Sequence, residues 1–217
     1  MLTRQDLTIE DCLETFDCVR SLGIQHIGFK DVGVPLETLK ALNRAIKASG
    51  ATSYMEVVSE TPEACVRSAR NAAEIGVDRL LGGTEVSAAL EILAGTGIEY
   101  LPFPGRPEGH PTRLAGGASD IEDDCRRFAE LGCSGVDLLA YRATEADPLE
   151  LVRAARRGMD GYLAVAGSID SPERIRAVAK AGADGFTIGT AALEGAFSPR
   201  KGALASQLMD ILEACVV

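Results

Sequence analysis

One pattern recurs seven times along this chain: an amphipathic segment ends in glycine, and a short apolar segment follows it. A glycine directly after a helix can adopt the left-handed conformation that turns the chain into the next strand. The successive glycines are 27, 26, 21, 35, 26 and 24 residues apart, which is the length of one strand–helix unit. They are Gly23, Gly50, Gly76, Gly97, Gly132, Gly158 and Gly182.

The segments after these glycines contain continuous apolar runs, which are typical of parallel strands covered on both faces. They are residues 24–31, 51–59, 77–83, 98–105, 133–141, 159–168 and 183–190. We expect an eighth, short strand near residues 1–4, followed by a helical stretch over residues 8–22. Eight strand–helix units in 217 residues predict the α/β class and one (β/α)₈ TIM-barrel domain over residues 1–217. The alternative is a doubly wound open sheet, but Arg4-Gln5-Asp6 stands where its glycine-rich fingerprint would follow the first strand.

The residues at the predicted helix starts support these strand and helix boundaries. Three helices are predicted to begin with a capping residue followed by proline at the first helical position. These pairs are Thr61-Pro62, Asp147-Pro148 and Ser171-Pro172. The spacing of Ser119 and Glu122 predicts a capping box at a further helix start.

The composition of the chain disfavours some classes of binding partner. The net charge of −10 makes nucleic acid an unfavourable partner, because binding its backbone needs a basic face. No apolar run reaches the ~20 residues of a membrane span, and residues 1–6 lack the features of a signal peptide. We therefore expect a cytoplasmic protein with a small-molecule partner, and a homodimer is one option by analogy with barrels of this size. The six cysteines form no C-x-x-C motif and are expected to be reduced and structural.

The spacing of 35 residues predicts a long loop over residues 105–118, at the catalytic end of a barrel strand. It contains His110. We interpret the loop as a lid or substrate-contacting segment, with a solvated excursion as the alternative. His110 would then bind substrate or act as an acid–base group, unless it is simply exposed.

The last two strands end in small residues, with Gly167-Ser168 after one and Gly189-Thr190 after the other. Glycine lets the backbone approach a ligand closely, and barrels commonly bind phosphate at this place. The segment Ala-Val-Ala-Gly-Ser, followed by Ala-Gly-Ala-Asp-Gly-Phe-Thr-Ile-Gly-Thr-Ala, resembles the closing half of the ribulose-phosphate-binding barrels. The resemblance implies that these four residues are phosphate ligands; the alternative is that the glycines only make tight turns.

The resemblance does not extend to one member family. Metal-dependent epimerases of this superfamily need two histidines and two aspartates on strand ends, and this chain has only His26 and His110. Aldolases of similar size place a Schiff-base lysine on strand six, which carries none here.

Alternation places Lys30 and Glu56 on the inner face of adjacent strands, near their carboxyl ends. Glu56 could act as a base at a carbon beside a carbonyl while Lys30 stabilises the enolate. Lys30 could instead form a Schiff base, or the two residues could be a structural ion pair.

Further charged and aromatic residues lie at or near strand ends. Arg4 could bind an anionic substrate group, and Asp31 could bind a hydroxyl or orient Lys30. Tyr141 and Arg142 follow strand six and are further substrate-binding candidates. We interpret His26 as a core histidine.

The sequence thus predicts a cytoplasmic enzyme that acts on a small phosphorylated metabolite, such as a sugar phosphate, by proton transfer at carbon. The class would be isomerase or epimerase, in carbohydrate metabolism. The alternatives are a carbon–carbon lyase that uses Lys30 and a non-catalytic sensor of phosphorylated metabolites. No cofactor is predicted, although carboxylates could hold Mg²⁺ together with waters.

Overall fold

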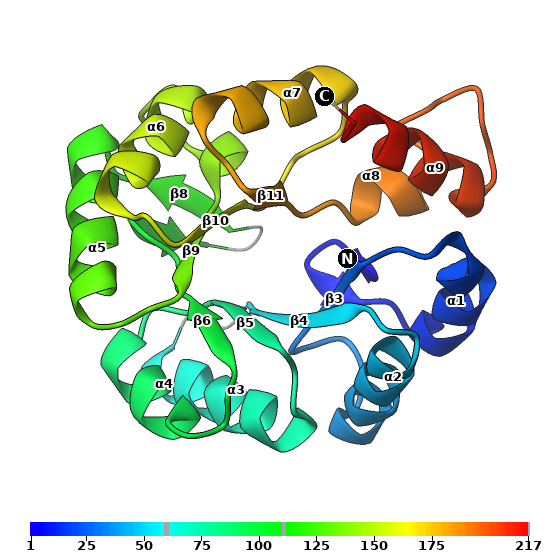
Figure 1. Cartoon of the computed structure of the whole chain (residues 1–217), viewed down its shortest axis with the longest axis horizontal. Helices are drawn as coiled ribbons and strands as arrows, with labels where there is room; N and C mark the ends of the chain where they lie inside the picture. Colours follow the sequence, from blue (N-terminus) through cyan, green and yellow to red (C-terminus); the bar gives the residue numbers. More distant parts are fainter. Residues whose placement is uncertain (59–60, 110–111, 217) are drawn as a thin grey trace. The chain divides into compact units, whose positions relative to one another are not determined.

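The computed structural model describes residues 1–58, 61–109 and 112–216. The chain divides into two compact units, Met1–Tyr100 and Leu101–Val217, and each is described by itself (Figure 1). Whether residues 1–217 behave as one domain stays a prediction.

Unit 1 contains a four-stranded sheet in the order β3-β4-β5-β6, in which β3 pairs parallel with β4 and β4 with β5. Helices α2, α3 and α4 lie along one face of this sheet (Figure 1). The elements are β1 (Thr3–Arg4), β2 (Leu7–Thr8), α1 (Cys12–Val19), η1 (Arg20–Leu22), β3 (His26–Lys30), α2 (Leu36–Ala48), β4 (Thr52–Val57), α3 (Pro62–Ile75), β5 (Arg79–Gly82), α4 (Val86–Leu93) and β6 (Glu99–Leu101).

Unit 2 contains a parallel sheet in the order β11-β10-β9 and a separate antiparallel hairpin, β7–β8. Helices α5, α6 and α7 lie outside its strands, and the short α8 lies beside α9 (Figure 1). The elements are β7 (Arg106–Glu108), β8 (Arg113–Ala115), α5 (Ala118–Glu130), β9 (Gly135–Leu138), η2 (Ala140–Arg142), α6 (Pro148–Gly158), β10 (Tyr162–Val165), α7 (Pro172–Ala181), β11 (Gly185–Phe186), α8 (Thr190–Leu193) and α9 (Leu204–Ala214).

Each of the seven strands predicted after the glycines is present, although each is shorter than expected. Their outward residues, such as Phe29 and Met55, are fully buried, as the alternation predicts. Six of the seven glycines have the left-handed backbone, and Gly158 is the exception. A β-carbon on Gly158 would collide with the carbonyl of Glu122 and with Cys125, so this glycine permits close packing of α6 on α5.

Three of the predicted caps are confirmed. Thr61 accepts the N–H of Ala64 at 3.3 Å, and Asp147 accepts two N–H groups at 3.0 Å. Ser171 accepts the N–H of Arg174 at 3.5 Å.

The capping box predicted at Ser119 and Glu122 is wrong. Helix α5 begins earlier, and Asp120 accepts the N–H of Gly117 at 2.9 Å. Glu122 instead pairs with two arginines, Arg126 and Arg157.

The beginning of the chain differs from the expected strand and long helix. Residues 3–8 form the antiparallel hairpin β1–β2, and helix α1 covers only Cys12–Val19. Gln5 and Asp6 have φ values of 50° and 61°, which turn the chain back on itself. The N–H of Leu2 donates to the carbonyl of Gly28 at 2.7 Å, so the chain still lies alongside β3 before the hairpin.

The predicted long loop contains the antiparallel hairpin β7–β8, in which Arg106 pairs with Ala115. Its strand β8 is attached to the segment after β9, because Leu114 and Ala143 form a bridge and Thr144 N–H donates to the Leu114 carbonyl at 3.0 Å.

The six cysteines are free thiols, and Cys12, Cys65, Cys125 and Cys133 are buried. Burial raises the pKa of Cys125 to about 12, so this thiol stays protonated and behaves as a packing group. Within the described residues, no helix combines the length and apolar character that crossing a membrane requires.

Candidate functional site

Three charged side chains meet at the carboxyl end of the unit 1 sheet. Lys30 Nζ lies 2.7 Å from Asp6 Oδ1 and 3.0 Å from Glu56 Oε1. All three residues are buried, with 5%, 7% and 4% of Lys30, Asp6 and Glu56 exposed. Lys30 and Glu56 are direct register partners on β3 and β4, so the predicted juxtaposition is confirmed. We call Asp6, Lys30 and Glu56 the Lys30 cluster.

The backbone that carries Lys30 is held by a buried hydroxyl. Thr8 Oγ1 donates to the carbonyl of Lys30 and accepts its N–H, both at 2.8 Å. The N–H of Thr8 donates to the carbonyl of Val32 at 2.9 Å, which fastens β2 to the loop after β3. The hairpin therefore fixes Asp6 and Lys30 relative to each other.

The charges of the cluster favour an ammonium ion at Lys30. Burial alone would lower the pKa of Lys30, but the charges and hydrogen bonds of Glu56 and Asp6 outweigh it and raise the pKa above its usual value. The α-amino group of Met1 is also buried beside the cluster: burial and the charge of Lys30 lower its pKa to about 6, although the charge of Glu56 raises it. Lys30 is thus the ammonium ion that contacts both carboxylates.

Asp6 was not among the residues predicted from sequence. Its side chain reaches Lys30 only because Asp6 sits in a left-handed turn, whereas we expected the residues after position 4 to lead into a helix. The available signal was the residue type, since aspartate tolerates this conformation better than most residues.

The other candidates in unit 1 take different places. Arg4 is exposed on β1. Asp31 stabilises the segment after β4: its N–H donates to the carbonyl of Glu56 at 3.1 Å, and its Oδ1 accepts the N–H of Val58 at 2.9 Å. Ser68 donates to the second oxygen of Asp31. Asp31 therefore holds the backbone that directly follows the Glu56 side chain.

The four predicted phosphate ligands lie at the ends of two neighbouring strands of unit 2. Gly167 and Ser168 follow β10 with φ values of 77° and 57°, and Gly189 and Thr190 follow β11. The strands pair in parallel, and Thr187 N–H donates to the Val165 carbonyl at 3.0 Å just before these ends.

Backbone donors are available at these strand ends. In the described parts of the chain, the N–H groups of Gly167, Ser168 and Gly189 have no acceptor. Successive N–H groups in such turns form concavities that suit anions.

Tyr141 and Arg142 belong to η2, which lies close to the Gly167–Ser168 turn after β10. A β-carbon on Gly167 would collide with the Arg142 side chain, which also donates from Nη1 to the Thr112 carbonyl at 3.3 Å. Arg174, which the sequence interpretation missed, donates to the carbonyl of Ser168 at 2.5 Å and lies 4.7 Å from the Tyr141 ring centroid. Arg174 lies in an ordinary amphipathic helix pattern, and nothing in the sequence marks it as a functional residue.

The amino end of the unit 1 sheet holds a different polar group of residues. His26 is exposed, so its interpretation as a core histidine is wrong. Its Nδ1 lies 2.9 Å from Tyr54 Oη, which accepts a hydrogen bond from Arg79 at 2.8 Å. Partial desolvation and the charge of Arg79 lower the pKa of His26.

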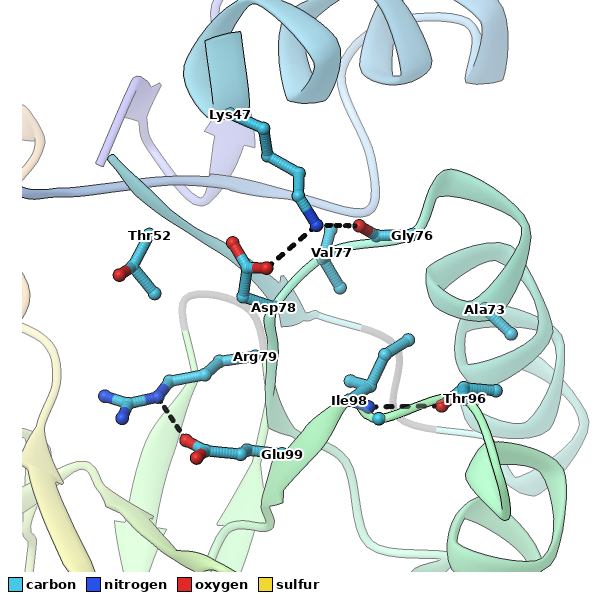
Figure 2. Close-up of a pocket in the computed structure, with 11 residues that line it drawn as sticks. Lys47, Thr52, Ala73, Gly76, Val77, Asp78, Arg79, Thr96, Ile98 and Glu99 are labelled. Carbon is cyan, nitrogen blue, oxygen red and sulfur yellow. Dashed lines mark hydrogen bonds and ion pairs between the residues drawn. The ribbon is translucent and has the colours of Figure 1, made fainter. Parts of the chain in front are cut away.

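A cavity of about 550 Å³ lies at this amino end of the sheet (Figure 2). Its charged lining residues are paired with one another. Figure 2 shows Lys47 reaching Asp78, at 2.8 Å, and Arg79 reaching Glu99, at 2.5 Å. The cavity is therefore lined by balanced ion pairs and lies at the opposite end of the strands from Lys30.

No group of three or more histidine, cysteine, aspartate and glutamate side chains within the described residues could hold a metal ion. Mg²⁺ stays a prediction. His110 lies outside the described residues.

Comparisons with known proteins identify the fold. No protein-family model matches this sequence, and no curated protein matches it. Among solved structures, 3-hexulose-6-phosphate synthase is similar over 96% of both chains, with a TM-score of 0.67 and 21% identity.

Two further structures agree. Orotidine 5′-phosphate decarboxylase from Pyrococcus horikoshii OT3 is similar over 95% of this chain and 93% of its own, with a TM-score of 0.62 and 16% identity. A native KDPGal structure is similar over 100% of both chains, with a TM-score of 0.65 and 13% identity. This chain therefore has the TIM-barrel fold of these structures, as the strand–helix repeat predicts.

Proposed function

We propose that this chain is an enzyme that acts on a small phosphorylated metabolite and transfers a proton at a carbon beside a carbonyl group, as an isomerase or epimerase. The observation that carries the proposal is the Lys30 cluster, in which one buried ammonium contacts two buried carboxylates. Removing three charges from water is unfavourable, and perturbed, buried charges gather at functional sites more often than elsewhere.

Each member of the cluster has a distinct role in this reaction. Glu56 removes the proton from carbon as the general base, and the Lys30 ammonium stabilises the negative charge that develops on the enolate oxygen. Asp6 keeps Lys30 charged and oriented through its 2.7 Å contact. A charged Lys30 suits this chemistry better than the lyase alternative, because a Schiff base forms only from a neutral amine.

The phosphate part of the proposal rests on unit 2. Gly167, Ser168, Gly189 and Thr190 would bind the phosphate group through backbone N–H groups and hydroxyls. Two of the similar structures are named for phosphorylated compounds, a hexulose 6-phosphate and an orotidine 5′-phosphate, which supports the same substrate class.

The test is hydrogen exchange at carbon. A panel of aldose and ketose phosphates is incubated with the protein in D₂O, and proton NMR follows loss of the signal at the carbon beside the carbonyl. We expect exchange with at least one compound, and a fall of about 10²-fold or more in Glu56→Gln. Glu99→Gln, which changes an exposed glutamate of the same unit, is the matched control and should retain the wild-type rate.

Two outcomes would contradict the proposal. A borohydride-stable adduct on Lys30 would establish the lyase alternative. Tight binding of a phosphorylated compound without exchange or turnover would favour the sensor.

The wider predictions belong to the same proposal: a cytoplasmic enzyme, no organic cofactor, and a homodimer. Light scattering on the purified protein would test the dimer, and assay with EDTA would test for Mg²⁺.

A further inference from the structure

At Lys30, a side chain bonds the edge of β3 where a strand would ordinarily pair. On the β4 edge, the N–H of Asp31 donates to the Glu56 carbonyl at 3.1 Å, as in a parallel ladder. The N–H and the carbonyl of Lys30 instead bond the Thr8 hydroxyl, which accepts the first and donates to the second, each at 2.8 Å. One hydroxyl thus does the work of a strand's N–H and C=O at the residue that carries the ammonium.

Backbone groups bond β3 and the loop after it on either side of this point. The N–H of Leu2 donates to the Gly28 carbonyl at 2.7 Å, and the N–H of Thr8 donates to the Val32 carbonyl at 2.9 Å. The chain therefore lies along β3 at Leu2, leaves it as the hairpin β1–β2, and returns at Thr8. Thr8 is the residue that closes the hairpin onto β3.

The segment that leaves β3 carries Asp6. Gln5 and Asp6 have left-handed φ values of 50° and 61°, which residues other than glycine keep only when the surrounding structure supports them. The support consists of the closure at Thr8 and the 2.7 Å contact between Asp6 Oδ1 and Lys30 Nζ. The place of Asp6 beside the ammonium therefore depends on how Thr8 is fastened to β3.

The surroundings leave this hydroxyl no substitute. Thr8 is 2% exposed, so water cannot replace a lost bond to the Lys30 N–H or carbonyl. Gly33 leaves the space that Thr8 occupies, because a β-carbon at Gly33 would collide with the nitrogen and the carbonyl oxygen of Thr8. A side chain at position 8 without a hydroxyl would leave two buried backbone groups unbonded, and the Lys30 backbone would have to move.

We propose that Thr8 is a positioning residue of the Lys30 cluster, whose hydroxyl holds the Lys30 backbone so that the ammonium contacts Asp6 and Glu56 together. This inference rests on the proposed function, because it makes turnover at the cluster depend on Thr8. Thr8 acts through Lys30 and not on the substrate. A displacement of about 1 Å at a reacting group can cost about 10²-fold in rate, so this hold on the backbone matters for turnover.

The first test is the kinetics of hydrogen exchange in D₂O with a sugar phosphate that the wild type processes. Thr8→Val keeps the shape of the side chain and loses its hydroxyl, so kcat should fall about tenfold or more while KM stays within about threefold. Thr8→Ser keeps the hydroxyl and should retain kcat within about threefold of wild type.

Thr3→Val is the matched control. Thr3 is the register partner of Thr8 in the same hairpin and is 5% exposed. Within the described residues, its side chain makes no hydrogen bond. Its kcat and KM should therefore match those of the wild type.

The second test does not depend on turnover. Brief acetylation with acetic anhydride, read by mass spectrometry, compares Lys30 with Lys180, which is exposed on α7. Lys30 is 5% exposed and contacts two carboxylates, so it should react more slowly than Lys180 in the wild type. Thr8→Val should raise the relative rate at Lys30 about fivefold or more, because a displaced ammonium loses the charges that keep it protonated. Thr8→Ser and Thr3→Val should leave it unchanged.

The two tests separate the inference from the proposal beneath it. If Thr8→Val keeps the wild-type kcat and the wild-type acetylation of Lys30, the role of Thr8 is overturned and the proposed function stands. If Thr8→Ser loses as much as Thr8→Val, the hydroxyl is not the cause and the inference also falls. If the wild type exchanges no compound, the proposed function fails, and acetylation alone decides whether Thr8 holds Lys30. Should Thr8→Val not fold, Thr8→Cys replaces it, since a thiol keeps the volume with a weaker donor.

Discussion

The two ends of the unit 1 sheet hold charge in opposite ways. At the carboxyl end, one ammonium faces two carboxylates, and all three residues are buried. At the amino end, each cation has one carboxylate, as in Arg79–Glu99 and Lys47–Asp78, and the glutamate side chain is 48% exposed. The same strands carry both groups, so the difference lies in solvation.

This difference supports the proposal that the carboxyl end is the functional one. Exposed, balanced ion pairs are screened by water and contribute little to stability. Buried charges are expensive to desolvate, and groups with perturbed pKa values gather at functional sites. A cavity of about 550 Å³ lies at the amino end, whereas the buried charges lie at the carboxyl end.

The largest expected difference between the two ends comes from removing one lysine from each. Lys30→Met should destabilise the protein by about 3–5 kcal/mol, because two buried carboxylates lose their cation. Lys47→Met should cost at most about 1 kcal/mol, since its pair with Asp78 is partly exposed. Urea unfolding measures both. Equal effects would mean that the Lys30 cluster is not desolvated as described.

Neutralising one carboxylate of the Lys30 cluster should have the next largest effect. Asp6→Asn keeps a residue that tolerates the left-handed turn but removes a charged partner of Lys30, and should cost about 1–3 kcal/mol. Asp17→Asn is the control, because Asp17 pairs with Arg20 on the exposed surface of α1. Its unfolding midpoint in urea should match wild type; a shift as large as that of Asp6→Asn would contradict the distinction.

Removing the arginine at the amino end should have a smaller effect. Arg79→Met loses a hydrogen bond to Tyr54 and the pair with Glu99, and should cost about 1 kcal/mol. The rate of hydrogen exchange at the substrate carbon, which we assign to the Lys30 cluster, should not change. A large loss of turnover in this variant would show that the amino end takes part in the reaction.

The smallest effect is a difference in pH dependence. The pKa of Lys30 is raised, so its stabilisation is complete below its ordinary value of 10.5 and is lost as pH rises through the higher folded value. The pKa of His26 is lowered, so its contribution is complete above 6.5 and is lost as pH falls through the lower folded value. As the pH falls from 8 to 5, the urea midpoint of the wild type should therefore decrease. The midpoint of His26→Gln should decrease less. Identical acid-side slopes would refute the role of His26.

Much of the fold could be predicted because its signals are local. A glycine such as Gly132 ends a helix by its own backbone preference, and the strand that follows is marked by its apolar run. The pairing of Lys30 with Glu56 was also predictable, because alternation and strand order bring both to one face of adjacent parallel strands.

Other features had no local signal. Gly158 resembles the other helix-ending glycines in sequence, but its role is set by α5, which packs against it. The contact of Asp6 with Lys30 depends on a two-residue turn that reverses the direction of the chain after β1. The contact of Arg174 with Ser168 depends on the turn after β10.

The sequence by itself determined the repeating unit, its direction and the residue types at the strand ends, because these follow from backbone preference and the two-residue period of a strand. Tertiary structure decided which charges meet. The hairpin at residues 3–8 brought a second carboxylate to Lys30, and the turn after β10 brought Arg142 against Gly167. Such contacts join residues more than twenty positions apart, and their strength depends on burial, which only the folded chain provides.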